Sequence, residues 1–221
     1  MKCAVIIVAG GRGVRMGSRL PKQFLPLCGK PLLMHTLEVF HRWNADARLM
    51  LALPEMHRPY WEMLCRELDW RVPHRVTPGG ETRFHSVRNA LAAVDGCDWV
   101  GVHDGVRPLV APEVIEACFR GAVRHGAALP AVPVAESLRE CDGERSRAVD
   151  RTRYRLAQTP QVFRRDWLEE AYRQPYSPLF TDDASVVEAA GRDICLVPGN
   201  PENIKITTPA DLLAAEKWLD R

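Results

Sequence analysis

The sequence predicts an α/β fold in which helices cover both faces of a mostly parallel sheet. Short apolar runs of strand length, such as Cys3–Ala9 and Asp98–Asp104, alternate with longer segments whose apolar residues recur at helical spacing. The runs are apolar almost throughout, which is typical of strands that are buried on both faces. Folds of this type bind their ligands outside the carboxyl ends of the strands, so we expect the functional residues there.

The alternation begins in the first half of the chain. After the strand at Cys3–Ala9, Pro31 opens a helical pattern in which Leu33, Leu37 and Phe40 recur. The elements that follow are a strand at Arg48–Leu53, a helix around Tyr60–Leu68, a short strand near Val72–Val76, a helix that carries Val87, Leu91 and Val94, a strand at Asp98–Asp104 and a helix at Pro112–Val123.

The alternation breaks after Val134. Residues Glu136–Gln158 are charged and irregular, with ECDGER as their turn, and we interpret them as a hairpin arm that leaves a single domain spanning residues 1–221. The pattern then resumes with helices at Asp166–Tyr172 and Asp183–Ala190, strands at Asp193–Val197 and Asn203–Thr207, and a last helix. The start of that helix is marked by Thr208 as N-cap, Pro209 in the first helical position and Asp211 in the first turn.

Composition argues against several classes of protein. The chain has 221 residues, 46% of them hydrophobic and 26% charged, and its formal net charge of +2 is too small to indicate a nucleic-acid or membrane partner. No apolar run approaches the roughly 20 residues that span a bilayer, and the layout of the first residues is not that of a signal peptide. The seven cysteines are scattered and never form a CxxC pair, which favours reduced thiols and a cytoplasmic location over a disulfide framework or a zinc site.

The first strand runs into a glycine loop with the sequence VAGGRGVRMG. A dinucleotide-binding fingerprint has the spacing G-x-G-x-x-G and an acidic residue about 20 residues later, but here one residue too many separates Gly13 from Gly17 and the acidic residue is missing. The lysine motif of ATP-binding phosphate loops is also absent. The loop contains Arg12 and Arg15, and Lys22 follows, which favours a ligand with several negative charges over a tight turn with solvated arginines.

Short motifs along nearly the whole chain carry a family resemblance. They are GGRGVRMGSRLPKQF at Gly10–Phe24, GGETR at Gly79–Arg83 with Ser86, VHDGVRP at Val102–Pro108, VDR at Val149–Arg151, TPQ at Thr159–Gln161, TDDAS at Thr181–Ser185 and NIKIT at Asn203–Thr207. In this order, they resemble the 2-C-methyl-D-erythritol 4-phosphate cytidylyltransferases of the non-mevalonate isoprenoid pathway. The resemblance implies a three-layer sandwich of the nucleotide-diphospho-sugar transferase type, around a mostly parallel twisted sheet. It also implies a homodimer whose projecting arm exchanges contacts with the partner.

The resemblance implies that the chain transfers CMP from CTP to a polyol phosphate and releases pyrophosphate. Because the attacking phosphate is already an anion, this reaction needs charge neutralisation and in-line positioning rather than a general base. By resemblance, Arg15, Lys22 and Lys205 supply catalytic positive charge. Asp104 ends a buried strand and by resemblance faces Mg²⁺, with other divalent cations as alternatives, whereas the plain structural interpretation is a carboxylate that caps a turn.

The resemblance also implies which residues bind the two substrates. The CTP contacts are Ala9, Gly10, Gly11, Gly13, Gly80, Glu81 and Ser86, with the base contact made by either Gly10 or Gly11. The polyol-phosphate contacts are Arg107, Ser137, Arg151, Thr159 and Thr181, with Lys205 as a further position. Arg151 lies on the predicted arm, so it is expected to reach the site of the neighbouring subunit. His103 points away from Asp104 across the strand and is expected to pack or hydrogen-bond rather than catalyse.

Several alternatives stay open. Glu136-Ser137 stands where the family carries Asp-Thr, which leaves a ribitol-5-phosphate cytidylyltransferase as a second enzyme. A non-catalytic nucleotide-binding protein has no reason to keep four charged site residues together, and a dinucleotide-dependent oxidoreductase lacks the glycine spacing. Ser86 has a second interpretation as an ordinary serine in the first turns of a helix, and Arg151 as a solvated charge.

Overall fold

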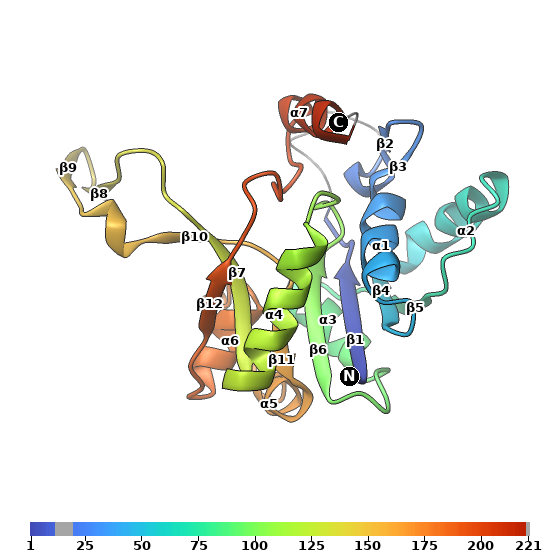
Figure 1. Cartoon of the computed structure of the whole chain (residues 1–221), viewed down its shortest axis with the longest axis horizontal. Coiled ribbons are helices and arrows are strands. Elements are labelled where there is room, and N and C mark those ends of the chain that lie inside the picture. The colour runs from blue at the N-terminus through green and yellow to red at the C-terminus, as the bar shows by residue number, and fades with distance from the viewer. Residues whose placement is uncertain (12–19, 220–221) are drawn as a thin grey trace.

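The computed structural model describes residues 1–11 and 20–219 of the chain. Among these residues, eight strands form a central sheet with helices on both faces (Figure 1). From one edge, the strands follow the order β5, β4, β1, β6, β11, β7, and both β10 and β12 also pair with β7. The predicted α/β fold with a mostly parallel sheet is confirmed.

Parallel strands form the N-terminal half of the sheet. They are β1 (Cys3–Val8), β4 (Arg48–Leu53), β5 (Arg75–Pro78) and β6 (Trp99–Asp104). β1 lies between β4 and β6, and its last residue, Val8, lies opposite both Ala52 and Asp104. Because these strands run in the same direction and end in register, the loops after β1 and β6 leave the sheet at one point.

Most strands in the C-terminal half of the sheet are not predicted by the sequence pattern. β7 (Ala127–Pro133) pairs antiparallel with β10 (Arg155–Ala157) and β11 (Gln161–Arg164), and parallel with the predicted β12 (Cys195–Pro198). Ala157 lies opposite Ala131 and Val162 opposite Ala128, so the segment between β10 and β11 bulges out of the ladder. Prolines within β7 and the short length of β11 hide these strands from a pattern-based prediction.

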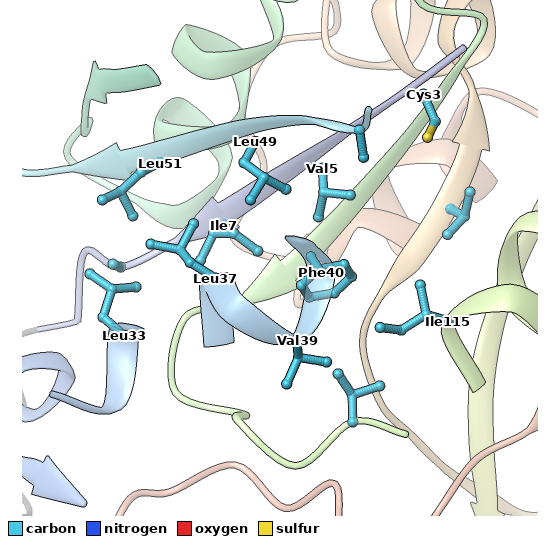
Figure 2. Packing of buried hydrophobic residues seen from close by; sticks show 14 of the residues in the cluster. Cys3, Val5, Ile7, Leu33, Leu37, Val39, Phe40, Leu49, Leu51 and Ile115 are labelled. Atoms are coloured by element: carbon cyan, nitrogen blue, oxygen red, sulfur yellow. The ribbon is translucent and has the colours of Figure 1, made fainter. Parts of the chain in front are cut away.

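Helices cover the two faces of the sheet, as predicted. A small hairpin of β2 (Pro26–Leu27) and β3 (Lys30–Pro31) precedes α1 (Leu32–Trp43). On one face of the sheet, α1 packs with α2 (Arg58–Glu67) and α4 (Pro112–His125). Ile7, Phe40 and Ile115 belong to the buried cluster on this face (Figure 2). α3 (Arg83–Leu91), α5 (Arg165–Ala171) and α6 (Asp183–Ala189) pack on the other face, against the alternate residues of the strands. None of the helices in the described part of the chain is both long and apolar enough to cross a membrane.

The segment before the last helix is not a strand, although the NIKIT sequence predicts one. It joins no strand of the described sheet, and its Ile206 N–H donates to Val106 O (3.0 Å) in the loop after β6. Ile206 is fully buried with Leu27 and Leu32, which accounts for the apolar pattern without a strand. α7 (Pro209–Leu219) begins as predicted, because the Asp211 N–H donates to the Thr208 hydroxyl oxygen (3.3 Å).

The predicted arm contains a hairpin that projects from the sheet (Figure 1). Its strands are β8 (Arg139–Asp142) and β9 (Arg145–Ala148), joined by a turn at Gly143 in the predicted ECDGER segment. Every residue of the two strands is exposed. The side chains of this hairpin are therefore not packed against the central sheet and its helices.

Candidate active site

A cavity of about 250 Å³ lies beside the ends of β1, β5 and β6. This is the carboxyl edge of the parallel strands, where the functional residues are expected. The predicted site residues that line it are Ala9, Gly10, Gly11, Lys22, Gly80, Glu81, Ser86, Asp104 and Lys205. Gln23, Thr82 and Arg83 also line the cavity, although the sequence gives them no role.

Asp104, the last residue of β6, is buried at the cavity among positive charges. Its Oδ2 lies 3.1 Å from Arg107 Nε and 3.2 Å from Lys205 Nζ, and its Oδ1 lies 3.7 Å from Arg83 Nε. Burial by itself raises the pKa of the Asp104 carboxyl, but Arg83, Lys205 and Arg107 together hold it well below its usual range. Asp104 is therefore an anion at neutral pH despite its burial.

His103, on the opposite face of β6, belongs to a hydrogen-bond network behind Asp104. Its Nε2 lies 3.0 Å from the carbonyl oxygen of Arg107, which can only accept, so Nε2 carries the proton. Nδ1 therefore accepts from the Thr159 hydroxyl (2.9 Å), and that hydroxyl oxygen accepts in turn from the Asp104 N–H (3.2 Å). Burial lowers the pKa of His103 to about 4. The structure confirms that His103 is packed and hydrogen-bonded.

The predicted polyol-phosphate residues lie in different places. Arg107 lies beside the cavity, in contact with Asp104. Thr159 is buried in the bulge between β10 and β11; its hydroxyl donates to His103 Nδ1 and accepts from the Asp104 N–H, and it does not line the cavity. Thr181 is exposed just before α6, and Ser137 and Arg151 are exposed on the arm, away from the lining of the cavity.

An ion pair at the wall of the cavity, between Arg83 and the fully buried Asp183, is not predicted from the sequence. Arg83, the first residue of α3, donates from Nη1 and Nη2 to the two carboxylate oxygens of Asp183 (2.7 and 2.6 Å), the first residue of α6. The hydroxyl of Tyr172 also donates to Asp183 (2.6 Å). The motifs GGETR and TDDAS contain the two charged residues, but they lie 100 residues apart, so no local pattern connects them.

Gly80 and Ser86 form the wall that the family resemblance assigns to the base. The Gly80 N–H donates to Ser86 Oγ (2.9 Å), and the Ser86 hydroxyl donates to Thr82 O (2.9 Å). A Cβ on Gly80 would lie 2.4 Å from His85 Cβ, so only glycine fits there. Ser86 is buried in the first turns of α3, makes two hydrogen bonds and lines the cavity.

The described ends of the glycine loop are held beside the cavity. Gln23, in a short 3₁₀ helix at Lys22–Phe24, is buried and donates from Nε2 to Ala9 O (2.9 Å). Lys22 Nζ lies 3.5 Å from Ile206 O, at the lining of the cavity. Arg15 and Gly13, which the sequence also assigns to the site, lie outside the described residues.

The residues of the cavity fit a magnesium ion that is bound by one carboxylate together with phosphate oxygens. In the described part of the chain, no group of three or more His, Cys, Asp or Glu side chains could enclose a metal ion by itself. Mg²⁺ is usually bound through one or two carboxylates, with substrate phosphates and water completing its shell. The ionised carboxylate of Asp104, beside Lys22 and Lys205, suits a metal that arrives with phosphates.

Comparison with known proteins agrees with this geometry. The family model described as 2-C-methyl-D-erythritol 4-phosphate cytidylyltransferase matches residues 3–221. The chain is 56% identical to a protein of that name from Bacteroides thetaiotaomicron over 212 residues, which cover 96% of this chain and 97% of the relative. It is 55% identical to one from Porphyromonas gingivalis over 215 residues, which cover 97% and 96%. Its fold is similar to the crystal structure of 2-C-methyl-D-erythritol 4-phosphate cytidylyltransferase from Thermus thermophilus, with a TM-score of 0.82, 35% identity and 100% of both chains covered.

Proposed function

The chain belongs to the 2-C-methyl-D-erythritol 4-phosphate cytidylyltransferase family and is a nucleotidyltransferase, and from this premise we propose how its cavity transfers CMP from CTP to 2-C-methyl-D-erythritol 4-phosphate. The products are pyrophosphate and 4-diphosphocytidyl-2-C-methyl-D-erythritol, a precursor in isoprenoid synthesis. One observation carries the proposal: an ionised carboxylate, Asp104, lies among three cations in a cavity that Lys22 also lines.

In the proposed reaction, a phosphate oxygen of the acceptor forms a bond to the α-phosphorus of CTP. The bond between that phosphorus and the bridging oxygen of the leaving pyrophosphate breaks at the same centre. Lys22 and Lys205 neutralise the charge that develops on the α-phosphate oxygens. The side chain of Lys205 is 42% exposed, so it can turn from Asp104 toward an incoming phosphate. The acceptor phosphate is already an anion, so the reaction needs no base to remove a proton.

We propose that the cytosine base lies against the wall formed by Gly80 and Ser86. The Ser86 oxygen accepts one hydrogen bond and donates another, which leaves one lone pair for a donor on the base. The Ala9 main chain beside it is fixed by hydrogen bonds from Gln23 and to Ala52 O. A wall of fixed main-chain groups favours a pyrimidine because the larger purine ring would have no room.

We propose that Asp104 holds Mg²⁺, or another divalent cation, together with phosphate oxygens of CTP. When bound, such an ion neutralises the charge of the triphosphate and polarises its phosphoryl oxygens. Arg83, Lys205 and Arg107 keep the pKa of Asp104 low, so the carboxylate is available as a ligand without first losing a proton. Arginine stays protonated at any pH at which the protein is folded, so Arg83 and Arg107 keep the pKa of Asp104 low throughout that range.

We propose that the protein acts as a homodimer through its arm, with Arg151 binding the acceptor phosphate in the partner's cavity. Ser137 and Arg151 are exposed and do not line the cavity of their own subunit, which supports a role elsewhere. A guanidinium group suits a phosphate because it offers a planar fork of donors. Arg107 and Thr181 of the receiving subunit complete the proposed acceptor site.

We infer a cytoplasmic location and no nucleic-acid or membrane partner. The seven cysteines are scattered along the chain and form no CxxC pair, which supports a reducing compartment over a disulfide framework. The net charge of +2 gives the surface no strong attraction for polyanions.

An acceptor panel tests the proposed function. Pyrophosphate release is measured with CTP and Mg²⁺ in the presence of 2-C-methyl-D-erythritol 4-phosphate, ribitol 5-phosphate, ribulose 5-phosphate or no acceptor. We expect release with methylerythritol phosphate, none without an acceptor, and none when ATP replaces CTP. A preference for ribitol 5-phosphate would overturn the acceptor and leave the mechanism standing. No acceptor-dependent release with any polyol phosphate would overturn the proposal itself.

A further inference from the structure

The ion pair between Arg83 and Asp183 lies at the wall of the cavity, and its carboxylate is buried. The side chain of Asp183 is 0% exposed and that of Arg83 is 26% exposed. Each carboxylate oxygen of Asp183 accepts a hydrogen bond from the Arg83 guanidinium group, at 2.7 and 2.6 Å, and the Tyr172 hydroxyl donates a third hydrogen bond. A buried ion pair adds little net stability, because the loss of hydration of two charges offsets their attraction. Net stability therefore does not explain why these two charges are placed together.

Arg83 connects the pair to the cavity. It lines the cavity, whereas Asp183 does not. The guanidinium group is planar and rigid, so two bonds to Asp183 at one edge fix the direction of Nε at the other. That Nε lies 3.7 Å from Asp104 Oδ1. Asp183 can thus affect Asp104 through Arg83 without touching a ligand.

The three cations around Asp104 are held in different ways. Lys205 has a flexible side chain that is 42% exposed. Arg107 lies three residues after Asp104 in the same loop and also donates from Nη1 to the main-chain oxygen of Asn203 (2.7 Å). Arg83 comes from a separate helix, and a carboxylate other than Asp104 anchors it. When phosphates enter and attract Lys205 away from Oδ2, Arg83 keeps its place beside Oδ1.

The helix that carries Asp183 does not need this side chain to begin. Asp182 caps α6 by accepting from the Ser185 N–H (2.9 Å), and the Ser185 hydroxyl oxygen accepts from the Asp182 N–H (3.2 Å). Gln161 Oε1 also accepts from the Ala184 N–H (2.8 Å). The carboxylate of Asp183 is therefore left to act on Arg83.

We propose that Asp183 is a positioning residue for the transfer reaction: it holds Arg83 in place, and Arg83 orients the Asp104 carboxylate toward the metal and phosphates of the bound nucleotide. Tyr172 supports this arrangement by fixing one oxygen of Asp183. The inference rests on the role proposed for Asp104. Asp183 and Arg83 thus act on the reaction only through Asp104.

The test compares Asp183→Asn with a matched control, Glu169→Gln. Glu169 pairs with Arg165 on α5 (2.6 Å), so the control removes a carboxylate from an arginine pair that does not line the cavity. Binding of Mn²⁺ with CTP is measured by electron paramagnetic resonance without an acceptor, so no turnover occurs. Asp183→Asn is expected to weaken binding about tenfold and to raise the Mg²⁺ concentration for half-maximal rate by a similar factor, as when a residue that orients a ligand is lost. Glu169→Gln is expected to change neither.

Two further variants keep the test decisive. Tyr172→Phe leaves both charges in place and is used if Asp183→Asn does not fold; it is expected to weaken binding about threefold, as for the loss of one hydrogen bond. Asp104→Asn is measured in parallel. If Asp104→Asn weakens binding while Asp183→Asn or Tyr172→Phe binds like the wild type, the role of Asp183 is wrong. If Asp104→Asn itself binds like the wild type, the proposed function of Asp104 has failed and the inference fails with it.

Discussion

Two arginine–carboxylate pairs of this protein share their chemistry and differ in their surroundings. At the wall of the cavity, the side chains of Arg83 and Asp183 are 26% and 0% exposed; on the arm, those of Arg147 and Glu140 are 77% and 56% exposed, with their atoms 2.5 Å apart. The first pair fixes a charge beside Asp104, whereas the second is open to solvent. The body thus fixes the charges of the site, and the arm presents side chains that are not packed against the central sheet and its helices. We propose that a complete site combines the cavity of one subunit with the arm of the other.

The largest expected effect is on the stability of the body. Asp183→Asn should lower the free energy of unfolding by about 3 kcal/mol, because the largely buried Arg83 guanidinium then keeps only the more distant carboxylate of Asp104 as a counter-charge. Urea denaturation at neutral pH measures this loss. A loss below about 1 kcal/mol would mean that water or another group replaces the carboxylate and that the pair is not the rigid element described here.

The next effect is on turnover. Lys22→Ala should lower kcat by at least about 10²-fold, equivalent to about 2.7 kcal/mol, the scale seen when one group that stabilises a transition state is removed. Arg15→Ala is expected to do the same, on sequence grounds alone. Arg71→Ala, which removes an exposed arginine that does not line the cavity, serves as the control and should keep wild-type turnover. Near wild-type turnover of Lys22→Ala would contradict its assignment.

Acid sensitivity should also come from the body. The pKa of His103 is lowered by burial from 6.5 to about 4, so between these values the unfolded chain binds a proton that the folded chain does not. Stability is therefore lost as the pH falls through this window, by about 2 kcal/mol between pH 7 and pH 5. The carboxyl of Asp104, whose pKa is lowered from 3.8, does not titrate there. The stability advantage of the wild type over His103→Gln should shrink by this amount, and parallel curves would contradict the shift.

The smallest effect is expected on the arm. Glu140→Gln should change the free energy of unfolding by less than about 1 kcal/mol, because solvent screens an exposed ion pair. The same urea denaturation measures it, side by side with Asp183→Asn. A loss as large as that of Asp183→Asn would show that the two pairs do not differ as their burial implies.

Residues whose role depends on local sequence could be predicted. Asp104 was identifiable as the end of an apolar strand, Lys22 by its place after the glycine loop and Lys205 by its motif, and all three line the cavity. The start of the last helix at Thr208 follows from capping chemistry in the same way. In each case, the information lies within a few neighbouring residues.

Residues whose role depends on distant partners could not be predicted. Arg83 and Asp183 lie 100 residues apart, and hydrophobic periodicity carries no information on such a pair. Thr159 is engaged by His103 because of a bulge between two strands, which depends on the register of the pairing. The strand predicted at NIKIT fails for a related reason: an apolar alternation shows which residues are buried, but not whether a neighbouring strand is there to pair with them.

The most direct test of a site shared between subunits uses two inactive homodimers. Arg151→Ala removes the arm's arginine, and Lys22→Ala removes the lysine of the cavity. After subunit exchange, each mixed dimer would contain one site with both residues, so an equimolar mixture should regain about a quarter of wild-type activity with CTP and 2-C-methyl-D-erythritol 4-phosphate. Exchange is verified independently by mass spectrometry of the intact dimers. Verified exchange with no regain of activity would place Arg151 in the site of its own subunit and contradict the claim that the arm of one subunit completes the cavity of the other.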